Sequence, residues 1–186
     1  KNNSSSNKVP TNFAKPLRSQ GESYFYALDK RYVGLDKPLA FFGKPHDNSA
    51  LVKINIGIEE NGGGLVQIRS DEWSYYLNNA IHSGDGFIVG KLVFYLENGE
   101  TVTCFDKKVR RYVNGIFYSD YKLTRNEVHL LEEFNVDRVQ FTKSNLGNIE
   151  GYRYKSFMYN FVSYRSESTK DKVSSLFGPY WEKRDD

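Results

Sequence analysis

The chain has 186 residues and a nearly balanced charge, with 26 Lys and Arg against 23 Asp and Glu. That balance gives no strong positive field of the kind that nucleic-acid-binding proteins use. A single cysteine excludes an internal disulfide and every zinc or redox motif built on a pair of cysteines. No apolar run approaches the roughly 20 residues of a membrane-spanning helix. Aromatic residues make up 16% of the chain, which suits a β-rich globular fold.

Residues 1–20 differ in composition from the rest of the chain. They are rich in Asn, Ser and Lys and include Pro10 and Pro16, so they offer too little apolar surface to fold. We therefore expect a flexible polar leader or tether over residues 1–20 and a single domain over residues 21–186. Such a leader is typical of a chain that has lost a signal peptide or that follows a lipid anchor upstream of Lys1. The composition favours an exported protein, in the periplasm, on the cell surface or outside the cell, with a cytoplasmic location as the alternative.

The first part of the domain contains extended and turn-rich sequence. Residues 21–32 suit a short helix or an edge strand, and residues 35–48 have the Pro and Gly content of turns. Residues 51–58 alternate apolar and polar side chains, which predicts a strand, and residues 65–69 follow as its partner. Residues 71–81 place apolar side chains at helical spacing and predict a short helix.

Two Asn-Gly pairs, Asn98-Gly99 and Asn114-Gly115, are the clearest structural signals in the chain. Asn-Gly between two extended stretches predicts a two-residue hairpin turn, because both residues tolerate a positive φ. The strands expected around these two turns span residues 87–96, 101–106, 109–113 and 116–121.

A two-residue turn at Asn98-Gly99 sets the register of the first hairpin. It places Leu96 opposite Thr101 and Val93 opposite Cys104. Both faces of the hairpin are then largely apolar. This predicts that helices or a second sheet cover both faces.

A capping box marks the start of a helix after the second hairpin. Thr124 followed by Glu127 three residues later predicts a helix that runs to residue 134. Asn135 can then adopt the left-handed conformation that ends a helix, and residues 136–142 return to an extended strand.

The last part of the chain predicts one more strand and one more helix. Residues 151–164 alternate like a long strand. Ser168 and Asp171 form a second capping box, which starts a helix that Gly178-Pro179 should end. Tyr180-Trp181 should then fold back on the body. The elements together predict a single α+β domain, dominated by antiparallel β-hairpins with two to three short helices packed on the sheet.

Few residues are candidates for catalysis. Cys104 is expected in mid-strand beside Val93 and Tyr95, where burial raises a thiol pKa, whereas a nucleophile requires a lowered one. The three histidines follow no metal-binding spacing, so we expect neither a metal site nor a cofactor. A hydrolase site assembled only by the fold is the alternative. Its loop candidates are His46, Asp47, His82 and Asp85, with Glu59 and Glu60 as further acids.

Aromatic and basic residues are interleaved in two segments, one beside the second hairpin turn and one in the last predicted strand. Aromatic rings next to cations stack on sugars or bases, and Arg and Tyr are common in interfaces. Packing with buried rings and solvated hydroxyls is the alternative. The candidate binding residues are Arg110, Arg111, Tyr112, Tyr152, Arg153, Tyr154, Lys155, Tyr159, Tyr164 and Arg165.

These observations favour a non-catalytic, exported or cell-envelope-associated domain. It is expected to bind a protein, glycan or envelope component through its aromatic and basic face. The small hydrolase is the first alternative. A single-stranded nucleic-acid binder on a β platform is the second, and the near-neutral charge weakens it.

Overall fold

The structure of this chain is a computed structural model, which describes residues 23–44, 49–71, 74–77, 80–83, 86–144, 156–164 and 168–185. Extended structure dominates it. The strands are β1 (Ser23–Ala27), β2 (Lys30–Gly34), β3 (Leu39–Gly43), β4 (Ala50–Ile58), β5 (Gly64–Asp71), β6 (Ser74–Leu77), β7 (Ala80–Ser83), β8 (Ile88–Leu96), β9 (Thr101–Val113), β10 (Ile116–Leu123), β11 (Val136–Ser144) and β12 (Ser156–Ser163). The helices are α1 (Arg125–Glu133) and α2 (Thr169–Asp185).

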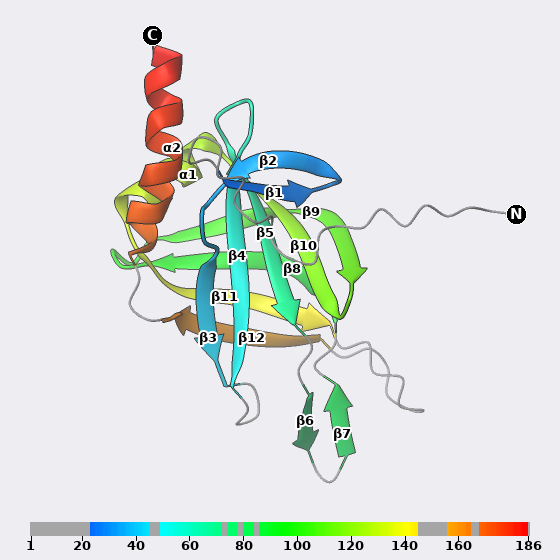
Figure 1. Cartoon of the computed structure of the whole chain (residues 1–186). Helices are drawn as coiled ribbons and strands as arrows, with labels where there is room; N and C mark the ends of the chain where they lie inside the picture. The colour runs from blue at the N-terminus through cyan, green and yellow to red at the C-terminus, as the bar shows by residue number, and fades with distance from the viewer. Residues whose placement is uncertain are drawn as a thin grey trace, which may run out of the picture.

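Eight antiparallel strands close into a barrel (Figure 1). Around the barrel they follow the order β3, β4, β5, β10, β9, β8, β11 and β12, and β12 pairs with β3 to complete the ring. The β1–β2 hairpin lies outside this ring and pairs with β4 through Gly34 and Gly57. β6 and β7 form a separate two-stranded sheet.

The α+β fold class predicted from the sequence is wrong, because the sheet closes on itself. Closure covers the inner face of every barrel strand with the inner faces of the other strands, so no helical layer is needed there. Phe94, Phe141 and Phe161, from the neighbouring strands β8, β11 and β12, are buried in this interior. The predicted antiparallel strands and hairpins are present, but the fold is mostly β.

The two helices pack against each other and cover one end of the barrel. Val128 and Leu131 of α1, with Val173 and Phe177 of α2, are buried in the same cluster as the barrel interior. We call the opposite end, where β10 begins and β11 ends, the distal end. Neither α1 nor α2 is long and apolar enough to span a membrane, nor is any other helix in the described part of the chain.

The predicted capping box at the start of α1 is confirmed. The Glu127 N–H donates to Thr124 Oγ1 (3.2 Å), and the Thr124 N–H donates to Glu127 Oε2 (2.7 Å). The predicted left-handed Asn135 is wrong. Phe134, in an extended conformation, ends the helix, and Asn135 is not among the residues with positive φ.

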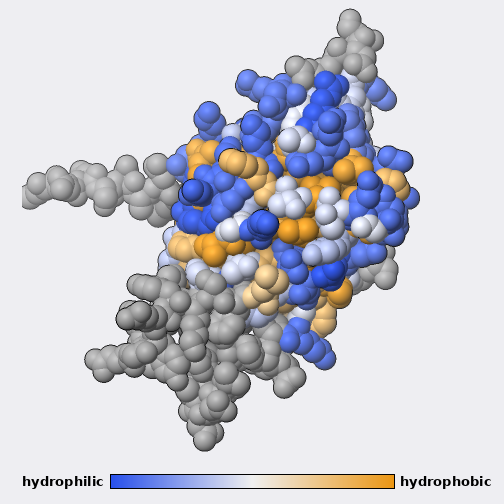
Figure 2. All heavy atoms as spheres, turned by 180° about the vertical axis from the view of Figure 1, so that it is seen from behind, coloured by the Kyte–Doolittle hydropathy of each residue, from blue (hydrophilic) through white to orange (hydrophobic). Residues whose placement is uncertain are grey.

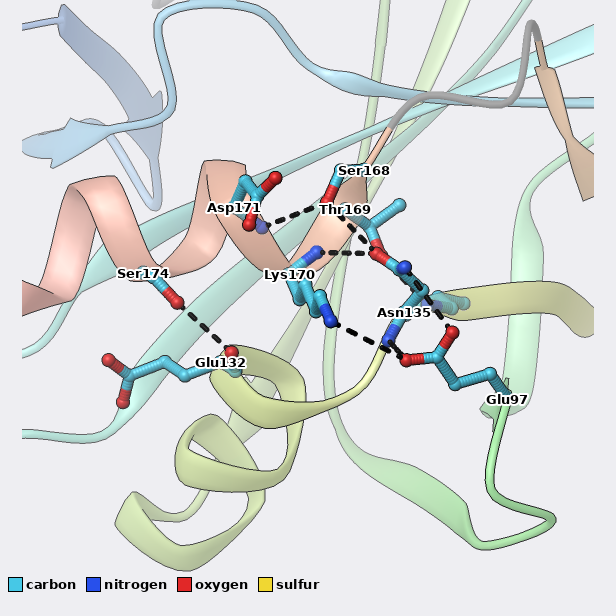
Figure 3. A network of polar contacts seen from close by, with 9 residues as sticks. Glu97, Glu132, Asn135, Ser168, Thr169, Lys170, Asp171 and Ser174 are labelled. Carbon is cyan, nitrogen blue, oxygen red and sulfur yellow. Dashed lines mark hydrogen bonds and ion pairs between the residues drawn. The ribbon is translucent and has the colours of Figure 1, made fainter.

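Asn135 instead ties three elements together (Figure 3). Its Oδ1 accepts hydrogen bonds from the Lys170 N–H (3.1 Å) and the Ser168 hydroxyl (3.2 Å) at the start of α2. Its own N–H donates to Glu97 in the β8–β9 turn (3.1 Å). Because these groups bond to one another, the network holds α2 on the barrel and serves a structural role.

The predicted end of the last helix at Gly178-Pro179 is wrong, since α2 continues through Pro179 to Asp185. A proline within a helix removes one backbone hydrogen bond and bends the axis. Contacts with the rest of the fold hold the helix on both sides of that point. The Tyr180 hydroxyl donates to the Glu60 carbonyl (2.9 Å), and Trp181 Nε1 donates to Glu132 (2.9 Å). Tyr180 and Trp181 thus pack on the body, as predicted.

The predicted register of the first hairpin is wrong by one residue. The Leu96 N–H donates to the Glu100 carbonyl (2.9 Å) and Gly99 has φ +89°, so the loop contains three residues. Leu92 therefore pairs with Cys104 and Tyr95 with Thr101. A one-residue shift moves every side chain of a strand to the other face.

The second hairpin follows its prediction. Val113 pairs with Ile116, and Asn114 and Gly115 have φ values of +50° and +79°. Two consecutive positive φ values make this a type I′ turn, the geometry that Asn-Gly favours.

Three other segments clarify or correct the sequence predictions. The predicted helix over residues 71–81 is wrong, because that segment contains β6 and the start of β7. The predicted turn region over residues 35–48 contains β3. Residues 21–32, left open between helix and strand, contribute to the β1–β2 hairpin.

Candidate functional site at the distal end of the barrel

Three neighbouring strands carry polar side chains on their inner face near the distal end. β10 lies between β5 and β9 and pairs with both. From the distal end towards the helices, the paired rows across β5, β10 and β9 are Ser70–Phe117–Tyr112, Ile68–Ser119–Arg110 and Val66–Tyr121–Asp106. Lys143 of β11, 3% exposed, extends to the same end, with Nζ 5.9 Å from the centroid of the Phe117 ring. We call Ser70, Asp106, Arg110, Ser119, Tyr121 and Lys143 the distal cluster.

A bulge in β9 places the charged members of this cluster. Val109 pairs with Asp120 and Asp106 pairs with Tyr121, so two extra residues lie between paired positions on β9. One of them, Lys108, has φ +57°. Because of the two extra residues, Asp106 and Arg110 pair with Tyr121 and Ser119, which are only two residues apart on β10, so their side chains are neighbours on the inner face.

Where the β8–β9 ladder stops, the Asp106 carboxylate accepts hydrogen bonds from backbone N–H groups that no longer pair with the neighbouring strand. It accepts hydrogen bonds from the Lys108 N–H (2.7 Å), the Gly90 N–H (3.2 Å) and Arg110 Nη2 (2.6 Å). Burial opposes ionisation, but these hydrogen bonds outweigh it, and they lower the pKa of Asp106. Asp106 is therefore an ionised structural acceptor.

The Nε N–H of the Arg110 guanidinium is available for a ligand. Nη2 bonds to Asp106, and Nη1 donates to the Val109 carbonyl (3.0 Å). Nε is buried and has no hydrogen-bond partner within the described structure. The guanidinium carbon lies 5.6 Å from the centroid of the Tyr121 ring, which places this N–H group in the interior beside Tyr121.

Two hydroxyl groups of the cluster are buried without a partner. The Ser119 hydroxyl donates to the Ile88 carbonyl (2.8 Å). By contrast, Ser70 Oγ and Tyr121 Oη, both from fully buried residues, make no hydrogen bond within the described part of the chain. Burial raises the pKa of Tyr121, so its hydroxyl stays protonated. A buried hydroxyl without a partner costs about 1–3 kcal/mol, and a bound ligand can supply the missing acceptor.

Aromatic rings form one side of the distal end. The Phe117 ring lies 4.5 Å from Tyr112 with a tilt of 34°, and 5.0 Å from Phe87 in an edge-on arrangement at 87°. Phe117 is buried, whereas Tyr112 is 54% exposed at the rim. These rings offer an apolar wall next to the polar groups of the distal cluster.

The candidate binding residues predicted beside the second turn fall on both sides of the barrel wall. Arg110 and Tyr112 face the interior with the distal cluster. Arg111 lies on the outer side and pairs with Asp29 of the β1–β2 turn (2.8 Å). Successive residues of a strand face opposite ways, so the candidates of this segment do not all share one surface.

The candidates from the last predicted strand are divided in the same way. Tyr159 contacts the interior residues Phe141 (5.8 Å) and Phe161 (6.2 Å), measured between ring centroids. The ring centroids of Tyr164 and Phe42 lie 6.3 Å apart. Phe42 follows the interior residue Phe41 on β3 and therefore faces outwards. Tyr152, Arg153, Tyr154, Lys155 and Arg165 lie outside the described residues.

The hydrolase candidates are not brought together within the described structure. His82 belongs to β7 and so lies in a strand, where a loop was predicted. Glu59 and Glu60 follow β4 at the helix end of the barrel, where their carbonyls accept the Tyr180 hydroxyl. His46, Asp47 and Asp85 lie outside the described residues. No group of three or more His, Cys, Asp or Glu side chains in the described part could hold a metal ion.

Cys104 is buried, as predicted, at 3% exposure, and burial raises the pKa of its thiol. Its surroundings differ from the prediction because of the register shift. Cys104 pairs with Leu92 on the inner face, and the neighbouring inner pair is Val102 with Phe94. The predicted neighbours Val93 and Tyr95 have the opposite parity and lie on the outer face.

Of the distal cluster, sequence reasoning found only Arg110 and missed Ser70, Asp106, Ser119, Tyr121 and Lys143 as functional candidates. A signal for Lys143 was present, since it shares its strand face with the buried residues Val139 and Phe141. A cation at an apolar position of an alternating strand indicates a polar place in the interior.

An aromatic and basic group that the sequence did not single out lies on the outer face of β8, β11 and β12. The Arg138 guanidinium lies 3.6 Å from the Tyr95 ring centroid and donates to Asn160. The Tyr95 hydroxyl and Asn160 both bond to Gln140. Since these groups satisfy one another, they brace the wall. On the face shown in Figure 2, hydrophobic areas are interrupted by hydrophilic ones.

No family model, curated protein or solved structure matches this chain. The functional proposal below therefore depends on the geometry of the distal cluster.

Proposed function

We propose that this protein is a non-catalytic binding domain that holds a small acidic ligand at the distal end of its barrel. One observation carries the proposal. Within the described structure, the hydroxyls of Ser70 on β5 and Tyr121 on β10 are buried without partners, and the Arg110 guanidinium on the adjacent strand β9 lies beside the Tyr121 ring. Hydrogen-bond donors of this kind, beside a cation, suit the oxygen atoms of an acid.

The state of the ionisable groups supports binding without catalysis. The Cys104 thiol has a raised pKa, which disfavours the thiolate that a nucleophile needs. Asp106 has a lowered pKa and is fixed by backbone and guanidinium donors, which disfavours proton transfer near neutral pH. Asp120 has a raised pKa, but its carboxylate accepts the Leu28 N–H of the β1–β2 turn on the outer side of the wall.

This proposal narrows the expectation from the sequence. The partner expected there was a protein, a glycan or an envelope component bound on one aromatic and basic face. Of the residues assigned to that face, Arg110 and Tyr112 belong to the distal end. We therefore propose a ligand small enough to enter the rim of the barrel.

The two adjacent arginines provide a matched test. We expect benzoate or acetate, added at constant pH and ionic strength, to raise the thermal unfolding temperature of the wild-type protein. Saturation at about 100 times Kd stabilises by about 2.7 kcal/mol, and a change of 1 kcal/mol shifts the midpoint by about 2–4 °C at this chain length. Arg110→Met should lose this shift, whereas Arg111→Met, on the outer face, should keep it.

Two outcomes of that experiment would contradict the proposal. One is that no small carboxylate stabilises the wild-type protein. The other is that Arg110→Met responds to the carboxylates as strongly as Arg111→Met, which would mean that the anions bind elsewhere on the surface.

A further inference from the structure

We propose that the ligand of the distal end is an aryl carboxylate, a small acid with its carboxylate attached to a flat aromatic ring. This inference rests on the proposed function and adds the chemical class of the ligand. It follows from three features of the distal end, which are the number of donors, the aromatic wall and the filled interior behind them.

The polar groups suit a carboxylate. Arg110 Nε, Tyr121 Oη and Ser70 Oγ are the groups of the distal cluster for which a missing hydrogen-bond partner is established. A carboxylate offers two oxygens in one plane, with about four acceptor positions. It can therefore accept from more than one donor, and Arg110 and Tyr121 lie side by side, with 5.6 Å between the guanidinium carbon and the ring centroid.

The same groups fit a phosphate group poorly. Tight phosphate binding by arginine uses two parallel N–H groups of the guanidinium. In Arg110 each terminal nitrogen already donates one hydrogen bond, to the Val109 carbonyl or to Asp106, so fewer of the five N–H groups are left for two parallel bonds to a phosphate. The ionised Asp106 also repels the second negative charge of a phosphate monoester.

The aromatic wall suits a flat apolar body. Phe117 occupies the row at the distal end, between Ser70 on one side and Tyr112 on the other. Aromatic rings prefer offset or edge-on partners 4.5–7 Å away. The exposed Tyr112 at the rim and the buried Phe117 behind it give a ring of the ligand two such partners.

The filled interior limits the length of the ligand. Beyond the row of Tyr121, towards the helices, the side chains of Leu123, Val102 and Phe94 are buried in one continuous cluster. Eight-stranded barrels have an interior that side chains just fill, or that holds one small ligand. The filled interior therefore excludes a long-chain fatty acid and limits the proposed ligand to a single ring with a carboxylate.

The test is calorimetric titration of the full chain with sodium benzoate, acetate and phosphate at the same pH and ionic strength. We expect benzoate to bind at least about tenfold more tightly than acetate, because ring contacts contribute affinity beyond the acid group. Phosphate should bind more weakly than benzoate by a similar factor or more.

A pair of phenylalanine variants tests the ring contact. Phe117→Leu should weaken benzoate by about tenfold and leave acetate unchanged, since leucine keeps most of the apolar volume but not the ring. Phe105→Leu is the matched control, because Phe105 is 69% exposed on the outer face of β9, and it should leave both affinities unchanged. Tyr112→Leu, at the exposed rim, repeats the test in a variant whose folding does not depend on a buried ring.

The outcomes separate the two proposals. Equal affinity for benzoate and acetate, or tighter binding of phosphate, would overturn the aryl carboxylate and leave a distal anion site in place. Benzoate affinity that neither Phe117→Leu nor Tyr112→Leu reduces would overturn the ring contact. Binding of none of the three anions would overturn the proposed function as well.

Discussion

Ser70 and Ser119 occupy neighbouring strands of the same interior, and their hydroxyls differ in one respect. Ser119 donates to the Ile88 carbonyl at 2.8 Å, where the β8–β9 ladder has stopped. Ser70, equally buried, has no partner in the described structure. At the scale of single residues, the first hydroxyl belongs to the wall, and the second is the kind of group that a ligand would satisfy.

This difference predicts opposite effects of the same substitution. Ser70→Ala should leave the free energy of unfolding unchanged or raise it by up to about 1 kcal/mol, because it removes an unsatisfied buried hydroxyl. Ser119→Ala should lower it by about 1–3 kcal/mol, because the Ile88 carbonyl loses its donor. Urea unfolding of both variants measures the two values. Equal losses in both variants would show that Ser70 is also bonded in the free protein.

At the scale of elements, polar contacts add to the buried apolar packing of Phe25 and Ala27 on Leu65 that holds the β1–β2 hairpin against the barrel. Asp120 accepts hydrogen bonds from the Leu28 N–H (3.2 Å) and from Gln67 Nε2 (3.1 Å). Leu28 and Asp29 form the hairpin turn with φ values of +51° and +60°, a conformation that costs free energy for a residue like Leu28. Asp120 thus stabilises a turn that the local sequence does not favour.

The charge on Asp120 makes this attachment sensitive to pH. Burial raises the pKa of Asp120, although the hydrogen bond from Gln67 lowers it. The folded state therefore binds a proton more readily than the unfolded state, and ionisation of Asp120 opposes folding at neutral pH. This opposition is complete above the raised pKa and disappears as the pH falls to the ordinary value of about 3.9.

Asp120→Asn, which cannot titrate, reveals the pH-dependent contribution of Asp120 to the free energy of unfolding. The stability of the wild type relative to Asp120→Asn should increase between about pH 7 and about pH 4.5. Asp106→Asn is the control, because the pKa of Asp106 is lowered. The stabilisation by ionised Asp106 is fully present above about pH 3.9. The stability of the wild type relative to Asp106→Asn should therefore stay nearly constant between about pH 7 and about pH 4.5. Urea unfolding of the wild type and both variants at about pH 7 and about pH 4.5 measures these differences. If the stability of the wild type relative to Asp120→Asn decreased as the pH fell, the pKa of Asp120 would not be raised.

At the scale of the whole molecule, local patterns predicted what is locally determined. The capping box of Thr124 and Glu127 and the type I′ turn at Asn114-Gly115 depend on a few consecutive residues, and both were read correctly. The Asn98-Gly99 turn contains three loop residues and not two, a choice that the dipeptide alone does not settle. The one extra loop residue shifts the pairing of β8 with β9 by one position, so the side chains of β8 that share a face with Cys104 differ from those predicted.

Closure of the barrel was not predictable from the same patterns. It depends on pairing between β5 and β10 and between β12 and β3, which are far apart in the sequence. Apolar residues on both faces of a hairpin indicate cover, but not whether helices or other strands supply it. The candidate site was missed for the same reason, since Ser70, Arg110 and Lys143 share an interior only once the ring is closed.

Tyr121 offers the most direct test of the central claim, which is that the barrel keeps buried donors for a ligand. In Tyr121→Phe, the free energy of unfolding and the affinity for benzoate should be measured on the same preparation. We predict a free protein at least as stable as the wild type, because the hydroxyl has no partner among the residues that the structure describes. Benzoate should bind up to about tenfold more weakly, the effect of one lost hydrogen bond. A variant that binds benzoate as tightly as the wild type, or that loses stability in the absence of ligand, would contradict the claim.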